Sequence, residues 1–504
     1  MKNRTFTSKL LIVPIVLCIS SVILMQGLSQ ESPAEQAKVI FEESGIQGGL
    51  IVHLNCGDGI LTEALKANDS FLVQGLDPSD ENVQKAREYI ASRQEYGPVS
   101  VDRLTGKYLP YKENLVNLIV AEDLGDIPKE EAMRVLTPNG VLMTKGAFGW
   151  NKTVKPKPDE IDEWNQYLYN AGGNPVSRDD VVGPIENYQW IGSPQWGRHH
   201  DTTASMSALV SAQGRIFYII DEGPTESIEL PADNYLVARD AFNGTILWKK
   251  SIPEWQDHLF SLKSGPAYLP RRLVAKGDRV YVTLGINAPL SELDAATGEV
   301  LRTFPNTEET SEVIFSDDTL FVLVGRPEKI EESYAPKETY VWSNADWARA
   351  AWAWNRDPGQ IMAINMSNGT VLWTKESPVA PLSLSADQKA VYFYDGSELI
   401  SLDRKNGNKN WQTDELRSRQ FDTAYAPRLV ICEDVLLFSN GMRSLLAFST
   451  LDGTKLWDAP QPGSGHYSPE DVFVINGYLE LKFAPERAKE LLEYGEKFIQ
   501  EHHR

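Results

Sequence analysis

Cysteine is scarce in this chain of 504 residues, in which only three occur. Cys18 lies in the apolar N-terminal run, whereas Cys56 and Cys432 lie in strand-like contexts far apart in the sequence. A framework of disulfide bonds, of the kind that supports small exported domains, is therefore excluded. Sites that need two adjacent cysteines are excluded as well.

Basic residues are also fewer than acidic residues. The chain has 49 lysines and arginines against 70 aspartates and glutamates, which gives a formal net charge of −21. A surface of this sign repels nucleic acid and anionic membranes. We therefore expect no nucleic-acid partner.

Long apolar runs are absent beyond the N-terminal region. The run from Leu10 to Met25 is short for a membrane span, which needs about 20 apolar residues. Basic residues without any acid precede it, and the small-residue sequence Gly27-Leu28-Ser29 follows. This order is typical of a secretory signal peptide. We expect residues 1–29 to be removed and the protein to be exported to the periplasm or the extracellular space. Contact with a membrane is expected only through this segment, if it stays uncleaved.

A chain of this length exceeds what a single hydrophobic core supports. Its patterns divide it into a signal peptide (1–29), an α/β domain (38–150), a linker (151–184), a repeat region (185–482) and a C-terminal helix (483–504). The linker is polar and contains Lys155-Pro156-Lys157-Pro158. We expect it to lie against a neighbouring domain.

The segment 38–150 alternates strand-like apolar runs with helical patterns, which predicts a parallel sheet with crossover helices. The expected strands and helices are 50–54, 61–67, 71–76, 82–91, 115–121 and 130–136, together with a strand that ends at Val101-Asp102.

Candidate cofactor-binding residues follow these strands. Gly57, Asp58 and Gly59 come where the first strand turns into a helix, and a backbone without side chains can approach a nucleoside there. Asp77 ends the second strand, where a carboxylate can receive both ribose hydroxyls. Asp102 ends the third strand, where it can accept from the exocyclic amine of adenine.

In order and spacing the segment resembles class I S-adenosylmethionine-dependent methyltransferases, over about a hundred residues. The resemblance implies a Rossmann-like α/β fold and S-adenosylmethionine as cofactor. The family usually carries an acid and a glycine where this chain has His53 and Asn55. These departures predict weak or absent affinity for the cofactor, and they leave open that Gly57, Gly59 and Asp77 only shape the fold.

A repeated pattern fills the second half of the chain. Residues 236–248 and 361–373 are copies of one another, and residues 293–301, 402–411 and 446–457 follow the same scheme. Each copy is a hairpin with a glycine where the turn needs a positive φ, and most copies end in tryptophan. Another pair of strands precedes each copy, at 215–220, 279–284, 319–324, 390–394 and 435–439.

Four short strands per unit at blade spacing predict a β-propeller. The pattern resembles the PQQ-like repeat family, which implies that Trp248, Trp373, Trp411 and Trp457 are buried between blades. A sixth unit begins at 471–479 but does not reach its hairpin. We therefore expect at least five four-stranded blades in an open arc, with the C-terminal helix or the first domain over one end.

The same resemblance argues against quinone binding. Quinoprotein dehydrogenases of this family hold pyrroloquinoline quinone (PQQ) between a tryptophan and a disulfide of adjacent cysteines, and no adjacent pair exists here.

A polar cluster precedes the first blade, formed by Arg198, His199, His200 and Asp201. These residue types can hold a metal or transfer protons. Adjacent histidines on a strand point to opposite faces, however, so we favour a hydrogen-bonded loop and expect no metal. No residue of the chain is assigned a catalytic role.

These patterns favour an exported binding or scaffold module that holds a protein partner or a small molecule at the propeller face. Two enzymatic alternatives stay open. One is an S-adenosylmethionine-dependent methyltransferase, and the other is a quinone-dependent dehydrogenase.

Overall fold

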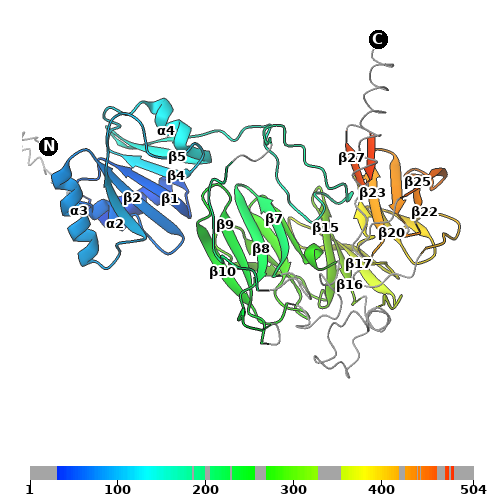
Figure 1. Cartoon of the computed structure of the whole chain (residues 1–504). Coiled ribbons are helices and arrows are strands. Elements are labelled where there is room, and N and C mark those ends of the chain that lie inside the picture. The colour runs from blue at the N-terminus through cyan, green and yellow to red at the C-terminus, as the bar shows by residue number, and fades with distance from the viewer. Residues whose placement is uncertain are drawn as a thin grey trace, which may run out of the picture.

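The computed structural model describes residues 31–183, 187–198, 205–227, 230–255, 268–326, 353–418, 426–439, 441–442, 444–461, 472–475 and 478–481. It contains a small α/β domain followed by a series of antiparallel sheets (Figure 1). Within the described part of the chain, no helix is long and apolar enough to cross a membrane. The predicted signal peptide (1–29) and C-terminal helix (483–504) lie outside the described residues.

The first domain is a six-stranded sheet in the order β3-β2-β1-β4-β5-β6. Strands β1 to β5 are parallel, and β6 returns antiparallel to β5. The elements are α1 (Pro33–Ser44), β1 (Gly49–Leu54), α2 (Ile60–Ala64), β2 (Phe71–Asp77), α3 (Asp80–Ser92), β3 (Val99–Arg103), β4 (Val116–Ala121), α4 (Lys129–Val135), β5 (Leu136–Gly146) and β6 (Gly149–Val154).

The local sequence explains most of these boundaries. Helix α1 begins with a capping box between Ser32 and Glu35, and it ends at Gly45 in the left-handed conformation. The central strands β1 and β4 are almost continuously apolar because helices cover both faces of a parallel sheet. The alternation of strands and helices is confirmed. Strand β6 extends into the range predicted as linker.

Five four-stranded antiparallel sheets and one two-stranded sheet follow, as the repeat pattern predicts. The first blade contains β7 (Met206–Ala212), β8 (Arg215–Asp221), β9 (Asn234–Asp240) and β10 (Ile246–Ile252). The second follows the 3-10 helix η1 (Leu269–Arg272) and contains β11 (Leu273–Lys276), β12 (Arg279–Thr283), β13 (Leu290–Asp294) and β14 (Val300–Thr303). The third contains β15 (Thr310–Ser316), β16 (Thr319–Val324), β17 (Gly359–Asn365) and β18 (Val371–Ser377). The fourth contains β19 (Ser385–Ala386), β20 (Ala390–Tyr394), β21 (Leu399–Asp403) and β22 (Lys409–Gln412). The fifth contains β23 (Arg428–Cys432), β24 (Val435–Ser439), β25 (Ser444–Ser449) and β26 (Lys455–Pro460). Strands β27 (Val472–Ile475) and β28 (Tyr478–Leu481) form the two-stranded sheet.

The sheets have two ends that differ in their connections. One end, here called the turn face, carries the tight turns within each blade, such as 213–214 and 241–245. The opposite end, here called the loop face, carries longer connections, such as 222–227 and 284–289. Figure 1 shows β7–β10 and β27 at opposite ends of the arrangement, so the described blades form an open arc and not a closed ring.

The turn between the third and fourth strands repeats one set of hydrogen bonds in the first four blades. In the first blade, Asp240 accepts from the backbone N–H groups of Phe242 and Asn243. Gly244 then adopts φ 73° and donates its N–H to the carbonyl of Asp240. Asp294, Asn365 and Asp403 make the same pair of contacts in the next three blades. An Asx residue four positions before glycine therefore defines the turn.

Tryptophans dock the first, third and fourth blades onto the turn of the blade that follows. The indole of Trp373 covers Gly407, where a Cβ atom would come within 2.7 Å of the ring. Its Nε1 donates to the carbonyl of Arg404 at 2.8 Å. Trp248 and Trp411 make the equivalent bonds to Ala295 and Thr450, at 3.0 and 2.9 Å.

The expectation for Trp457 is wrong. Trp373 and Trp411 are 8% and 9% exposed, whereas Trp457 is 40% exposed. The two-stranded sheet that follows brings no glycine turn to cover it among the described residues. The second blade is a further exception, because Arg302 and not tryptophan lies over Gly369.

Residues 163–174, here called the strap, belong to the range predicted as linker and run along the turn face (Figure 1). The strap contacts the inner strand of every blade near its C-terminal end. Backbone N–H groups at equivalent positions donate to strap oxygens: Ser211 to Trp164 O (2.7 Å), Ala275 to Asn165 O (2.8 Å), Phe315 to Gln166 Oε1 (3.0 Å), Ala386 to Ala171 O (2.9 Å), Ile431 to Gly172 O (2.8 Å) and Val474 to Asn174 Oδ1 (3.0 Å).

The continuation of the strap covers the free side of the first blade. Trp190 lies over Gly244, and its Nε1 donates to the carbonyl of Ala241 at 2.9 Å. These are the contacts that a preceding blade would make. The first blade is thus closed by the chain that leads into it.

The docking scheme predicts unequal effects of two matched substitutions. Trp373→Ala should lower the free energy of unfolding by about 3–5 kcal/mol, because it leaves a cavity between two blades. Trp457→Ala should lower it by only about 1 kcal/mol, because that side chain is 40% exposed and no described turn covers its indole. Urea or thermal unfolding of the two variants measures both values. Equal losses would contradict the assignment of the blade interfaces.

Candidate functional site

The predicted cofactor residues gather at one edge of the first sheet, beyond the carboxyl ends of its parallel strands. Asn55, Gly57 and Gly59 follow β1, and all three have positive φ values (54°, 58° and 80°). At Gly59 a Cβ atom would lie 2.7 Å from the Cβ of Ala86 on α3. Glycine is therefore required there for the helix to approach.

Asp77 is the centre of this edge, and its carboxylate is buried. Its Oδ2 accepts from Gly57 N at 2.9 Å. Its Oδ1 accepts from Ser79 N at 2.9 Å and from Asn82 Nδ2 at 3.0 Å. One side chain thus joins the loop after β1 to the start of α3.

The other two predicted acids lie further out. Asp58 is exposed, and its Oδ1 accepts from Ile60 N, at the first residue of the short helix α2, at 3.1 Å. Asp102 is exposed and pairs with Arg87 of α3 at 2.7 Å. The structure therefore brings Gly57 and Asp77 together, and it places Asp102 in a contact with α3.

His53 and Cys56 lie beneath this loop. The Nδ1 atom of His53 is 2.8 Å from Thr62 Oγ1, and the imidazole is buried. Burial lowers the pKa of His53 to about 4, against the opposing charges of Asp77 and Asp58. Burial likewise raises the pKa of the Cys56 thiol to about 12. At neutral pH the imidazole and the thiol are both uncharged.

Of the polar cluster before the first blade, only Arg198 is described, and His199, His200 and Asp201 lie outside the described residues. Arg198 is buried and pairs with Asp221 at 2.8 Å. Its guanidinium also donates to the carbonyl of Pro224 at 2.8 Å. These bonds fix the connection between β8 and β9. No group of three potential metal ligands occurs in the part of the chain that the structure describes.

The opposite edge of the first sheet binds the propeller. Asn117 at the start of β4 donates to Asp240 Oδ2 at 2.6 Å and accepts from Asn243 Nδ2 at 2.7 Å. Gly49 permits this arrangement, because a Cβ atom there would lie 2.0 Å from Asn117 Oδ1. The cofactor edge of the domain therefore faces away from the propeller.

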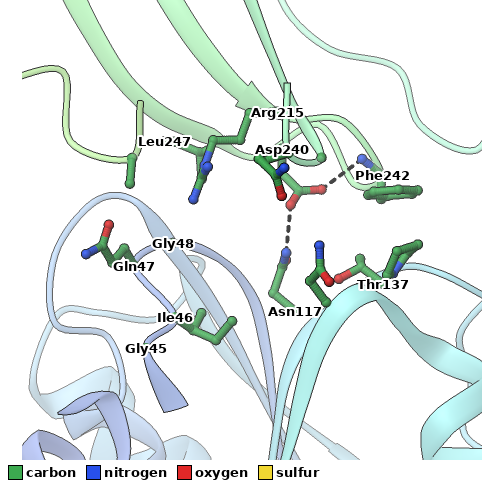
Figure 2. A pocket seen from close by; sticks show the side chains of 15 residues that line it. Gly45, Ile46, Gln47, Gly48, Asn117, Thr137, Arg215, Asp240, Phe242 and Leu247 are labelled. Carbon is green, nitrogen blue, oxygen red and sulfur yellow. Dashed lines mark hydrogen bonds between the residues drawn. The ribbon is translucent and has the colours of Figure 1, made fainter. Parts of the chain in front are cut away.

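A small polar cavity of about 100 Å³ remains at this interface. Figure 2 shows Asn117 and Thr137 of the first domain facing Asp240 and Arg215 of the first blade. Burial raises the pKa of Asp240, although Asn117 and two backbone N–H groups stabilise its charged form. Each oxygen of Asp240 has a partner, so the carboxylate serves to join the domains.

A larger cavity of about 330 Å³ opens on the loop face between the third and fourth blades. Glu309, Glu312, Arg326, Trp354 and Asp357 contribute to its lining. Glu312 is bound by Arg271 at 2.8 Å and by Leu382 N at 2.6 Å. Because acids outnumber bases in this group, the cavity suits a ligand group that is neutral or positively charged.

Sequence reasoning missed Asn82, Asn117 and the strap. Asn82 and Asn117 carry no local signal, because their partners are defined only by the fold. Trp190 did carry a signal in the sequence, because its distance from Gly244 is similar to the distance of Trp248 from Gly298.

The buried imidazole predicts a pH dependence of the first domain. The unfolded chain takes up a proton on His53 near pH 6.5 and the folded chain only near pH 4, so stability present above about pH 6.5 is lost as the pH falls toward about 4. His53→Gln lacks this titration. The difference in unfolding free energy between wild type and variant should therefore shrink by about 2 kcal/mol from pH 7 to pH 5. Urea unfolding at the two pH values measures it, and an unchanged difference would mean that folding does not lower the pKa of His53.

Comparison with known proteins gives one family match. Residues 232–475 match the family model described as outer membrane protein assembly factor BamB. No curated protein matches the chain. Among solved structures, BamB from Moraxella catarrhalis is 14% identical, with 56% of this chain and 67% of that chain covered and a TM-score of 0.34.

Methyltransferase structures match the first domain. An S-adenosylmethionine-dependent methyltransferase from Aquifex aeolicus is 21% identical, covering 21% of this chain and 62% of that chain with a TM-score of 0.20. Geranyl diphosphate C-methyltransferase from Streptomyces coelicolor is 19% identical, covering 22% and 44% with a TM-score of 0.20. The chain spans roughly half the length of the methyltransferase structures it matches. The chain thus joins a methyltransferase-like α/β domain to a BamB-like domain of PQQ-like repeats.

Proposed function

We propose that this protein is an exported binding module, in which the propeller presents its loop face to a protein partner and the methyltransferase-like domain is a structural unit. The observation that carries the proposal is the hydrogen bonding of the Asp77 carboxylate. Three donors from its own domain already occupy its carboxylate.

Ribose recognition at this position would require two hydroxyl groups to donate to the same carboxylate. A carboxylate offers about four acceptor positions. Three of them are used within the fold, and the side chain is buried. Binding of the cofactor in the expected manner would therefore break bonds that hold the loop after β1 against α3.

The propeller itself favours the loop face for binding. The strap and the first domain occupy the turn face, through contacts with the inner strands and with the turn of the first blade. The described connections of the loop face, such as 284–289 and 395–398, are held by rigid sheets. Loops on a rigid scaffold are common sites of recognition. The larger cavity opens on this face, where it would accept a side chain of a partner.

Export is supported by the N-terminal pattern and by the family match, whose description names an outer-membrane assembly factor. An exported protein has no evident supply of S-adenosylmethionine. This agrees with a structural role for the first domain.

A calorimetric titration with S-adenosylmethionine tests the role of Asp77. The mature protein should show no saturable binding. Asp77→Ala should lower the stability of the first domain by about 3 kcal/mol, because it leaves backbone N–H groups without their charged acceptor. The matched control Asp58→Ala, at an exposed acid of the same loop, should change stability little. Micromolar binding that Asp77→Ala abolishes would instead favour the methyltransferase alternative.

Site-specific photo-crosslinking tests the choice of face. Ser397 and Asn406 are exposed residues at opposite ends of the fourth blade, on the loop face and the turn face respectively. A photoreactive side chain at 397 should give an adduct with an envelope protein, whereas the same group at 406 should give none. An adduct from 406 alone, or from neither position, would refute the proposal.

A further inference from the structure

The second blade differs from the first, third and fourth blades at the position of the docking tryptophan. Arg302 of β14 occupies this position, and it pairs across the sheet with Glu292 of β13. In the other three blades a small residue lies opposite the tryptophan and leaves room for the indole. The pairs are Ala238 with Trp248, Ala363 with Trp373 and Ser401 with Trp411. Two oppositely charged side chains therefore replace a small residue and an indole in the second blade.

The other parts of the docking scheme are present at this interface. Gly369 of the third blade has a φ of 76°, as the turn requires. Tyr281 of β12 lies opposite Glu292, as an aromatic residue lies opposite the small residue in the three blades with a docked tryptophan. Those aromatic residues are Phe217, Phe321 and Tyr392, and their ring centroids lie 5.9–6.1 Å from those of the docked indoles. The departure is thus confined to residues 292 and 302.

The charged pair is buried without full hydrogen bonding. Nη1 of Arg302 lies over Gly369, where a Cβ atom would come within 2.5 Å of it. This Nη1 atom and Oε2 of Glu292 are both buried, and neither has a hydrogen-bond partner in the part of the chain that the structure describes. Arg302 Nε lies 3.5 Å from Oε2 of Glu292, and Arg279 Nε lies 3.1 Å from Oε1. A buried polar atom without a partner weakens the contact that buries it.

The two kinds of interface therefore differ in what opening would cost. Water can hydrogen-bond to the carboxylate of Glu292 and the guanidinium of Arg302 once they are exposed, which offsets the contacts that are lost. A docked tryptophan would instead lose buried apolar area. It would also lose a hydrogen bond, because each docked Nε1 donates to a turn carbonyl at 2.8–3.0 Å. Opening is thus easiest between the second and third blades.

The remaining contacts between these two blades provide a pivot. Their first three strands share an apolar cluster that includes Leu290 and Met362. Arg271 of η1 and Glu312 of β15, whose side chains are both 1% exposed, form an ion pair at 2.8 Å. The strap binds the third blade through the side chain of Gln166. Because a side chain can rotate, these strap bonds can follow a small movement of the blade.

We propose that the interface between the second and third blades is a hinge. Strand β14 moves away from the turn at 366–370, while the apolar cluster and the strap stay in contact. The movement changes the angle between two bodies, which are the first domain with the first two blades and the last three four-stranded blades. Local openings of this kind occur where few apolar contacts hold an element. The hinge uses neither Asp77 nor the connections of the loop face, so it does not depend on the function proposed above.

Thiol labelling measures the opening at two equivalent positions. Met366 and Thr450 each follow the first residue of a turn, and they are 7% and 6% exposed. Met366 lies at the hinge, whereas the carbonyl of Thr450 binds the docked Trp411. Met366→Cys and Thr450→Cys introduce one thiol each into protein that carries Cys432→Ser, in which Cys56 stays buried. Under native conditions a thiol reagent should modify position 366 roughly tenfold faster than position 450.

Two sets of substitutions separate the hinge from general instability. Glu292→Ala combined with Arg302→Trp supplies the missing indole and the space for it, and it should slow modification at position 366 roughly tenfold without a change at position 450. Glu292→Gln leaves Arg302 without its charged partner, so it should speed modification at position 366 alone. This second variant decides the matter if the double variant does not fold. Equal rates at the two positions would mean that both thiols are reached by global unfolding, and they would overturn the proposal. A rate at position 366 that the substitutions leave unchanged would overturn it as well.

Discussion

The inner edge of the propeller sheets is the constraint on which the arrangement of this molecule depends. Every described blade begins with an edge strand whose outward-facing backbone N–H groups have no partner within the sheet, and a buried N–H without an acceptor costs about 1–3 kcal/mol. The strap supplies an oxygen to the equivalent N–H of six successive inner strands, from Ser211 to Val474. Because the strap follows directly from the first domain, the same bonds hold that domain on the turn face. A segment with the composition of a linker therefore connects the inner strands of successive blades.

The blade interfaces add a second, directional constraint. Each tryptophan binds the turn of the following blade, so the series needs a partner at both of its ends. At the first end Trp190 takes the place of a preceding blade, and Gly244 is covered as in the interior of the series. At the last end Trp457 keeps the cross-strand position of a docking residue, and no turn covers it among the described residues.

The sequence predicts well what is encoded locally. Three expected strands agree with β16, β20 and β24 at both ends, because each is a run of mostly apolar residues between polar turn residues. Non-local features were inaccessible. The sequence around Trp457 resembles that around Trp373, and only the next sheet decides which of them is buried. The position of Asp77 at the end of β2 was predictable, whereas its three donors depend on how the loop after β1 meets α3. The strap partners lie up to 300 residues away in sequence, which composition and periodicity do not reveal.

The first domain uses the polar groups of both its edges for structure. At the carboxyl edge, Asp77 joins the glycine-containing loop after β1 to α3. The loop keeps the backbone path of a nucleoside-binding loop, but the carboxylate that would accept from a ribose is already bonded to groups of the domain. At the amino edge, Asn117 connects β1, β4 and the first propeller turn, and Gly49 has no side chain that would block it. A catalytic domain would need the acceptor groups of its carboxyl edge to be available to a cofactor. A domain that anchors the strap needs its amino edge to be bound to the propeller. The contacts at both edges agree with the second requirement, as the proposed structural role of this domain expects.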